Sequence, residues 1–235
     1  MTGGTVLITG GNRGIGLATA QAFLDAGQKV AVTYRSGEPP AGMLAVRCDV
    51  TDPAAVSRAF DEVESAYGPV AVLVSNAGIT RDALLLRMGE EDFADVVQTN
   101  LTGAFRMARR AARSMIRARA GRLIFVSSVV ALHGSAGQCN YAAAKAALIG
   151  LARSLARELG SRNITSNVIA PGFVDSDMTA VLSEERKKSI LASVPLGRFA
   201  AADEVAGAVE FLAGEDAAYI TGAVIPVDGG LGMGH

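Results

Sequence analysis

The stretch TVLITGGNRGIG, residues 5–16, decides the fold. Its apolar beginning, Thr5–Thr9, predicts a buried strand, and apolar residues then recur at helical spacing from Ile15 to Phe23. The glycines between them allow a tight turn and a close approach of backbone amides to a pyrophosphate. The helix N-terminus adds partial positive charge toward such phosphates. This order of strand, glycine turn and helix indicates a dinucleotide site, although a glycine turn can also be only a tight connection.

A second informative stretch, GRLIFVSSVVALHGSAGQCNYAAAKAAL, spans residues 121–148. Its apolar run, 123–126, predicts a strand buried on both faces, and Ser128 follows the end of that strand. Tyr141 and Lys145 open a predicted helix, and residues four apart lie on the same helix face. Because a nearby cation favours the phenolate, we expect Lys145 to lower the tyrosine pKa from about 10. The pattern indicates a general acid with its tuning charge; by itself, it also fits a surface tyrosine beside a solvated lysine.

Strand and helix patterns alternate along the remainder of the chain. Further apolar runs predict strands at 29–34, 45–48, 70–74, 164–170 and 223–227. The predicted fold class is therefore α/β, a Rossmann-type doubly wound parallel sheet of about seven strands with helices on both faces. We expect residues 1–235 to form a single dinucleotide-binding domain, because a doubly wound unit of this size is commonly one domain.

Composition narrows the class of protein. Half of the 235 residues are hydrophobic and 19% are charged, and the net charge of −1 comes without any basic block. The N-terminus lacks the cationic region of a signal peptide, and no apolar run reaches the roughly eighteen residues of a membrane helix. Cys48 and Cys139 lack metal-ligand spacing, and His133 and His235 do not complete a metal cluster. We expect a cytoplasmic protein with reduced thiols, no metal, and no nucleic-acid or membrane partner.

The residues after the second predicted strand, 29–34, bear on the choice of nucleotide. In dinucleotide folds an acidic residue near this point accepts hydrogen bonds from the ribose hydroxyls and selects NAD. Here no acidic residue occurs between that strand and Glu38. Arg35 follows the strand instead, and Arg13 lies in the glycine turn. Two guanidiniums suit the 2′-phosphate of NADPH, so we predict NADPH as the cofactor; the alternative is two solvated surface arginines.

Together, these motifs resemble those of the short-chain dehydrogenase/reductase family. The matching motifs, in the family's order, are TGGNRGIG, Asn76-Ala77-Gly78, Ser128, Tyr141-x-x-x-Lys145 and Pro171-Gly172. More narrowly, the stretch 171–179 and the ending 222–235 look like those of 3-oxoacyl-[acyl-carrier-protein] reductases of actinobacterial and mycobacterial type.

This resemblance implies an NADPH-dependent reduction in fatty-acid biosynthesis. The substrate would be a 3-oxoacyl thioester of acyl carrier protein or CoA, and the product the (3R)-3-hydroxyacyl thioester. Reduction of another ketone, such as a sugar, steroid or quinone, is one alternative. A non-catalytic NADPH-binding scaffold is the other.

Four catalytic residues are implied by the resemblance. Tyr141 would donate a proton to the developing alkoxide, and Ser128 would donate a hydrogen bond to the same oxygen. Lys145 would lower the tyrosine pKa and hold the nicotinamide ribose hydroxyls. Asn100 would position a relay water; a mid-helix asparagine in the predicted helical region 90–119 also suggests a kink by itself.

The resemblance also implies a cofactor site. Asp49 would meet the adenine amino group and Val50 the adenine ring, with an N-cap role as the alternative for Asp49. Asn76 would lie against the cofactor, brace the central sheet, or do both. Main-chain groups near Val174 would contact the nicotinamide amide, and Ser176 replaces a more usual threonine. The full set is Gly10, Asn12, Arg13, Ile15, Gly16, Arg35, Asp49, Val50, Asn76, Ala77, Gly78, Tyr141, Lys145, Val174 and Ser176.

Three further expectations concern assembly and substrate access. The resemblance implies a homotetramer, and the apolar ending 222–227 suits an interface. The segment 178–196 is interpreted as a helical lid over the substrate, with a plain surface helix as the alternative. If the substrate arrives on an acidic carrier protein, we expect Arg119 and Arg162 at the mouth of the site, since each matches a basic position of the reductases. Ordinary arginines at helix ends are the alternative.

Overall fold

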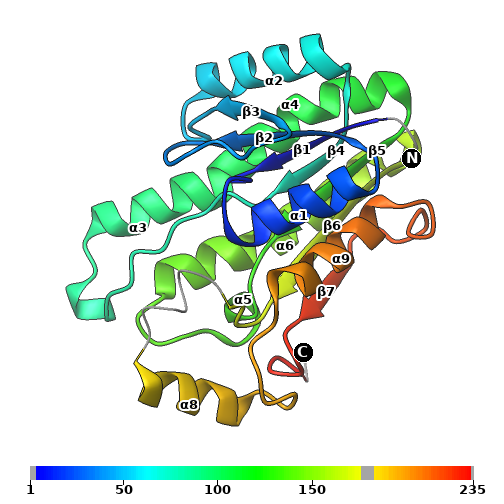
Figure 1. Cartoon of the computed structure of the whole chain (residues 1–235). Coiled ribbons are helices and arrows are strands. Elements are labelled where there is room, and N and C mark those ends of the chain that lie inside the picture. Colours follow the sequence, from blue (N-terminus) through cyan, green and yellow to red (C-terminus); the bar gives the residue numbers. More distant parts are fainter. Residues whose placement is uncertain (1–3, 176–182, 234–235) are drawn as a thin grey trace.

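The apolar runs of the chain pair side by side into one parallel sheet in the order β3-β2-β1-β4-β5-β6-β7 (Figure 1). The structure is a computed structural model that describes residues 4–175 and 183–233. The strands in these residues are β1 (Thr5–Thr9), β2 (Lys29–Tyr34), β3 (Leu44–Arg47), β4 (Val70–Ser75), β5 (Gly121–Val126), β6 (Ile164–Pro171) and β7 (Val224–Val227). The predicted fold class, a doubly wound α/β sheet, is confirmed, and each predicted strand lies within two residues of an observed one.

Helices cover both faces of the sheet. They are α1 (Gly14–Asp25), α2 (Pro53–Tyr67), α3 (Glu90–Val97), α4 (Gly103–Ala118), α5 (Val130–His133), α6 (Cys139–Leu159), α8 (Glu184–Ser193) and α9 (Ala202–Ala213). Because side chains of a strand alternate between faces, Leu7 packs with α2, α4 and α6, whereas its neighbours Val6 and Ile8 pack with α1 and α9. No helix in the described part of the chain is both long and apolar enough to cross a membrane.

The turn between β1 and α1 depends on glycine. Gly10 and Gly14 have φ angles of +64° and +53°, which favour residues without a Cβ. Gly16 needs glycine for a different reason. A Cβ added there would lie 2.3 Å from the Gly10 carbonyl oxygen and 2.5 Å from Asn76 Nδ2. The helix can therefore pack directly on the strand end, as the sequence motif predicted.

We expect Gly16→Ala to lower the free energy of unfolding by about 1–3 kcal/mol, because the backbone must shift to accept the methyl group. Urea denaturation measures the effect. Gly207→Ala in α9 is the matched control, since a Cβ there meets nothing within 4 Å. That control should leave stability unchanged or raise it. Equal losses in both variants would contradict the close-packing argument.

The predicted helical region 90–119 is interrupted at Asn100. The chain forms α3, then a π-helical turn over Gln98–Thr102, and then α4. A π turn inserts an extra residue into the helix and often occurs at functional sites. The expected kink at Asn100 thus takes the form of a π turn, and it turns a fully buried asparagine, 1% exposed, toward the end of β4.

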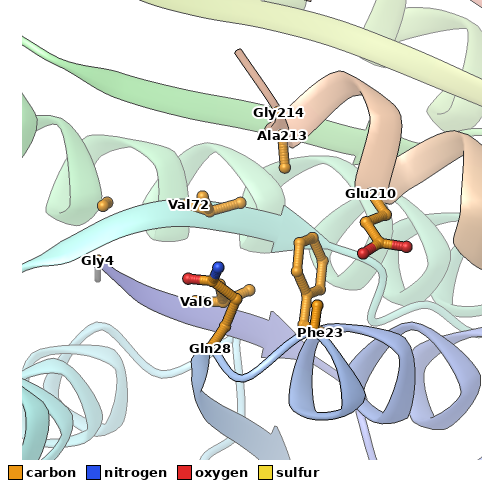
Figure 2. Close-up of a pocket in the computed structure, with 10 residues that line it drawn as sticks. Gly4, Val6, Phe23, Gln28, Val72, Glu210, Ala213 and Gly214 are labelled. Atoms are coloured by element: carbon orange, nitrogen blue, oxygen red, sulfur yellow. The ribbon is translucent and has the colours of Figure 1, made fainter. Parts of the chain in front are cut away.

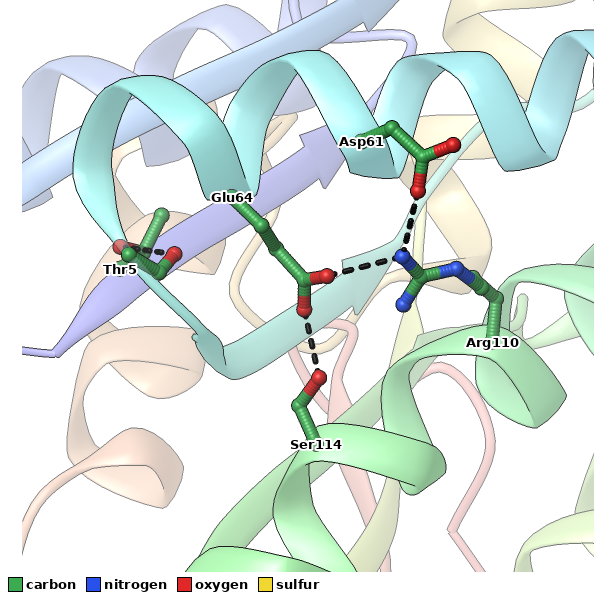
Figure 3. A network of polar contacts seen from close by, with 6 residues as sticks. Thr5, Asp61, Glu64, Arg110 and Ser114 are labelled. Atoms are coloured by element: carbon green, nitrogen blue, oxygen red, sulfur yellow. Dashed lines mark hydrogen bonds and ion pairs between the residues drawn. The ribbon is translucent and has the colours of Figure 1, made fainter.

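A polar network joins α2 to α4 outside the sheet (Figure 3). Arg110 of α4 donates to Asp61 at 2.9 Å and to Glu64 at 2.8 Å, and Ser114 donates to Glu64 at 2.6 Å. The Arg110 guanidinium also lies 4.9 Å from the centroid of the Phe60 ring. Burial alone would raise the pKa of the Glu64 carboxyl, but its bonds to Ser114 and Arg110 outweigh burial and lower it.

Arg110→Ala should lower the free energy of unfolding by about 1.5–3 kcal/mol at pH 7, because charge-assisted bonds to Glu64 are lost. The folded-state pKa of Glu64 lies below its ordinary 4.5. Its stabilisation is therefore complete above that pH and lost as pH falls through the folded-state value. We expect the difference between wild type and variant to shrink in urea titrations run below pH 4.5. A difference that stays constant from pH 7 to 3 would contradict this.

Arg58→Ala provides the control for that measurement. Arg58 lies on α2 and pairs with Asp52 at 3.7 Å, but its side chain is 71% exposed. Exposed pairs contribute about 0–1 kcal/mol. This variant should therefore be close to wild type in stability at every pH tested.

Candidate active site

A cleft of about 560 Å³ opens at the carboxyl ends of the central strands, where ligands bind in doubly wound folds. Every described residue of the predicted catalytic and cofactor sets lines this cleft except Gly16 and Asn100, which lie behind its wall. Ser176 lies outside the described residues. The sequence motifs, which are spread over more than 160 positions, are thus brought together in one place.

A second cavity lies near the amino ends of β1 and β4 (Figure 2). It holds about 130 Å³ between α1 and α9, and its lining includes Phe23, Val72 and Glu210. None of the predicted site residues that the structure describes lines it. This cavity is therefore distinct from the cleft that holds the predicted residues.

One end of the large cleft is cationic. Arg13 and Arg35 are both exposed there, on the glycine turn and directly after β2. Asn12 ties these two segments together, because its Nδ2 donates to the Ser36 carbonyl at 3.0 Å. The two guanidiniums therefore flank the same end of the cleft, as a 2′-phosphate site requires.

Asp49 lies between this cationic end and β3. Its Oδ1 accepts hydrogen bonds from the Thr51 amide at 2.8 Å and from the Thr51 hydroxyl at 2.7 Å. Burial alone would raise its pKa, but the Thr51 bonds and the charges of Arg35 and Arg106 lower it. Asp49 is therefore an ionised acceptor on the cleft wall. The N-cap of α2 is Asp52, which accepts from the Ala54 amide, so the alternative N-cap role for Asp49 is not realised.

The middle of the cleft is formed by the residues after β4. Asn76 Nδ2 donates to the carbonyls of Thr9 and Gly10 at 3.0 and 3.1 Å. The Thr9 hydroxyl in turn accepts from the amides of Asn76 and Ala77. Asn76 does brace the central strands, as one of the two readings predicted. Thr9 was missed at the sequence level, because a threonine at a strand end gives no signal of a partner 67 residues away.

The far end of the cleft holds the tyrosine–lysine pair. Lys145 is almost completely buried, and its Nζ lies 5.7 Å from the centroid of the Tyr141 ring. That ammonium donates to the Val126 carbonyl at 2.7 Å, and the Ser127 hydroxyl donates to the Lys145 carbonyl at 2.8 Å. The end of β5 and the first turns of α6 are therefore linked twice. The predicted helix, with both side chains on one face, is confirmed.

The expected lowering of the tyrosine pKa is wrong for the chain alone. Burial raises the pKa of Tyr141 to about 12; the hydrogen bond with Ser128 offsets part of this, and the Asp82 charge adds to it. Burial likewise lowers the pKa of Lys145 to about 8. Removal from water is therefore the largest cause of both pKa shifts, and the lysine charge is not among the causes that act on the phenol. The contact between Tyr141 and Ser128 brings the predicted donor pair together.

Asn100 lies behind Gly78, next to this pair. Its Oδ1 accepts from the Ile79 amide at 2.8 Å, and its Nδ2 donates to the Ile79 carbonyl at 3.0 Å. A Cβ at Gly78 would lie 3.2 Å from Asn100 Oδ1 and 3.4 Å from Lys145 Nζ. The asparagine side chain therefore clamps the chain that leaves β4, close to the lysine. Its role in a water relay stays a prediction.

The loop after β6 completes the wall. Val174 is buried and forms a bridge with Ala200. The predicted lid is described only from residue 183, where Ser183 caps α8 by accepting from the Arg186 amide. The segment after α8 is hydrogen-bonded to the C-terminal segment, since the Leu196 amide donates to Gly229 at 3.1 Å. Whether this helix acts as a lid stays a prediction.

Arg119 and Arg162 do not lie at the mouth of the cleft of their own chain, contrary to expectation. Arg119 precedes the amino end of β5, Arg162 precedes that of β6, and Arg119 donates to the Ser161 carbonyl at 3.3 Å. Ser128 follows the other end of β5. A six-residue strand spans roughly 20 Å, so the two arginines sit at the opposite edge of the sheet.

The cleft at the carboxyl ends of this doubly wound sheet holds a tyrosine, a buried lysine and a serine hydroxyl together. These are the features of an NAD(P)-dependent oxidoreductase. Comparison with known proteins narrows this class. A family model described as enoyl-(acyl carrier protein) reductase matches residues 10–232. The chain belongs to the short-chain dehydrogenase/reductase family.

Several curated relatives match nearly the whole chain. The 3-oxoacyl-[acyl-carrier-protein] reductase MabA of Mycobacterium avium is 58% identical over 98% of this chain and 91% of its own length. The enzyme of the same name from Mycobacterium tuberculosis is also 58% identical, with 94% of its length covered. The 3-oxoacyl-[acyl-carrier-protein] reductase FabG of Escherichia coli is 46% identical over 98% of both chains.

Proposed function

We propose that the protein reduces a 3-oxoacyl thioester, carried on acyl carrier protein or CoA, to the (3R)-3-hydroxyacyl thioester with NADPH in fatty-acid biosynthesis. The observation that carries this is the placement of Ser128, Tyr141 and Lys145 together at one end of a dinucleotide-sized cleft. The names and coverage of the curated relatives support the substrate class. The proposal includes a single domain over residues 1–235 and a cytoplasmic location.

The residues of the cleft fit NADPH. The glycine turn exposes backbone at Gly14, where a Cβ would meet nothing within 4 Å, so the main chain is open to a phosphate. Asp49 and Val50 would receive the adenine, Ala77 and Gly78 the middle of the cofactor, and Val174 the nicotinamide amide. The predicted contact of Ser176 belongs to the same proposal. NADPH, when bound, supplies the hydride.

The proton chemistry is assigned to the chain's own side chains. Tyr141 donates its phenolic proton to the carbonyl oxygen as hydride adds to the carbon. Ser128 donates a hydrogen bond to that oxygen and stabilises its developing charge. With a pKa of about 12, Tyr141 is protonated at neutral pH and so carries the proton that is to be transferred. Lys145 would hold the ribose hydroxyls of the bound nucleotide, and its charge would stabilise the phenolate left after transfer. Asn100 positions the water that returns a proton.

One assay tests the function. NADPH oxidation is followed at 340 nm with acetoacetyl-CoA and a 3-oxoacyl-carrier protein as substrates, beside a panel of sugar, steroid and quinone ketones. Crotonyl-CoA is included because the matching family model is described as an enoyl reductase. We expect kcat/KM for the 3-oxoacyl thioesters to exceed that for every other compound by at least tenfold. Preference for crotonyl-CoA or an unrelated ketone would overturn the substrate assignment, and binding of NADPH with no turnover would favour a scaffold.

A homotetramer forms part of the proposal. Phe105 and Ile116 of α4 expose 45% and 38% of their surface, and they lie on the outer side of the helix, away from the sheet. Large exposed apolar side chains of this kind suit an interface between subunits. Light scattering at micromolar concentration should give four times the chain mass. A monomeric mass would refute the tetramer and leave the catalytic assignment standing.

A further inference from the structure

Tyr141 lies in the first turn of α6, and this helix has no ordinary side-chain N-cap. The first N–H groups of a helix lack intrahelical partners, and the N-cap residue, Gln138, makes no side-chain capping bond. Asn140, inside the turn, supplies the acceptor instead: its Oδ1 accepts from the Tyr141 amide at 2.8 Å. The backbone from which the phenol projects is thus held by the adjacent side chain.

The other end of the same carboxamide reaches two distant segments. Asn140 Nδ2 donates to the Arg81 carbonyl at 2.9 Å, in the loop after β4, and to the Asp92 carbonyl of α3 at 3.4 Å. The residue is completely buried, at 0% exposure. A buried carboxamide whose donors and acceptor all bind main chain sets the spacing between those segments. Its loss would leave buried groups unpaired.

Two further hydrogen bonds connect the same segments. Gln138 Nε2 donates to Asp82 Oδ2 at 2.8 Å, and the Ala83 amide donates to the Gly137 carbonyl at 2.9 Å. Both join the loop after β4 to the residues just before α6, but the Gln138–Asp82 bond is solvent-exposed. Asn140 is therefore the buried member of this set of contacts.

Lys145, one turn further along α6, has separate anchors. Its Nζ donates to the Val126 carbonyl, and its own carbonyl accepts from the Ser127 hydroxyl. Removing the Asn140 carboxamide should therefore free the end of the helix that carries Tyr141, while the lysine and the cofactor-facing part of the cleft stay in place. This asymmetry distinguishes a positioning role from a general effect on folding.

We propose that Asn140 is a positioning residue that holds the Tyr141 phenol in line with Ser128 and Lys145. The inference rests on the proposed role of Tyr141 as proton donor. Asn140 is buried and does not line the cleft. It acts through the main chain of the residue beside it and through the loop and helix to which it is bonded.

The test compares Asn140→Ala with wild type in the acetoacetyl-CoA assay. We expect kcat to fall about tenfold, since a misplacement of roughly 1 Å can cost up to about a hundredfold. The Kd for NADPH, followed by nucleotide fluorescence, should stay within twofold. The solvent deuterium isotope effect on kcat should rise, because proton transfer from a misplaced donor limits the rate more. Asn140→Ser, whose hydroxyl can still accept from the Tyr141 amide, should recover part of the lost kcat.

Asn167→Ala provides a matched control. Asn167 of β6 is also completely buried, donates to the Ile220 carbonyl at 2.8 Å and accepts from the Ala223 amide at 3.0 Å. It should cost similar stability in urea denaturation but leave kcat per folded enzyme and the isotope effect unchanged.

Three outcomes would overturn the positioning role. One is a kcat for Asn140→Ala within threefold of wild type. The second is an equal loss of kcat in Asn167→Ala. Should Asn140→Ala fail to fold, the third is a folded Asn140→Ser variant with wild-type kcat and isotope effect. Tyr141→Phe in the same assay separates this inference from the function itself, because full activity there would remove the donor assignment on which both depend.

Discussion

Tyr141→Phe should lower kcat by a hundredfold or more and leave NADPH affinity and the unfolding midpoint nearly unchanged. A positioned general acid contributes about 10²–10⁴-fold, and only the hydroxyl is lost. The phenol is the group in hydrogen-bond contact with Ser128 at the end of the cleft, and its raised pKa keeps it protonated at neutral pH. Stopped-flow or steady-state oxidation of NADPH with acetoacetyl-CoA measures the loss.

Tyr219→Phe is the control for this substitution. Tyr219 is fully exposed and does not line the cleft, so removal of its hydroxyl should change neither kcat nor KM. If Tyr141→Phe kept more than about a third of the wild-type kcat, another group would have to supply the proton, and the catalytic assignment would be wrong.

Arg35→Asp should shift the cofactor preference from NADPH toward NADH by tenfold or more. Each charge-assisted bond to the 2′-phosphate is worth about 1.5–3 kcal/mol, and the new carboxylate repels the phosphate while it can accept from a free 2′-hydroxyl. Asn12 holds the segment after β2 against the glycine turn, so the substitution changes the charge at a fixed position. The ratio of kcat/KM values for the two nucleotides is the measurement.

Arg58→Asp, on the surface of α2 and outside the cleft, should leave that ratio unchanged. Equal losses for NADPH and NADH in Arg35→Asp would show that Arg35 does not contact the 2′-phosphate.

Most of the fold could be predicted from local sequence patterns, which are the apolar runs, the helical spacing and the glycine turn. The strands could be placed because parallel strands are buried on both faces and read as continuous apolar runs. The tyrosine and lysine could be placed on one face because helical spacing is a property of the chain itself. The glycine turn could be recognised for the same reason, since the positive φ angles at Gly10 and Gly14 belong to the local backbone.

The properties that could not be predicted depend on the tertiary surroundings of a side chain. The pKa of Tyr141 is set by burial, which no spacing of residues reveals. Asn140 binds carbonyls 59 and 48 positions away, so its role has no local signature. The misplacement of Arg119 had a different origin. A residue that precedes a strand must lie at the amino edge of a parallel sheet, and that rule, applied to the sequence, would have placed it there.

The π turn at Asn100 makes the length of this segment as important as its composition. An α-helix advances by 100° per residue, so deletion of a single residue from Gln98–Thr102 would restore regular winding and change the phase of everything on one side of it. Either Met107, Ala111 and Met115 would rotate away from the sheet, or Asn100 would rotate away from Ile79. One inserted residue therefore couples the packing of α4 on the sheet to the position of Asn100 behind the cleft. A deletion or insertion in Gln98–Thr102 should be more damaging than most substitutions there.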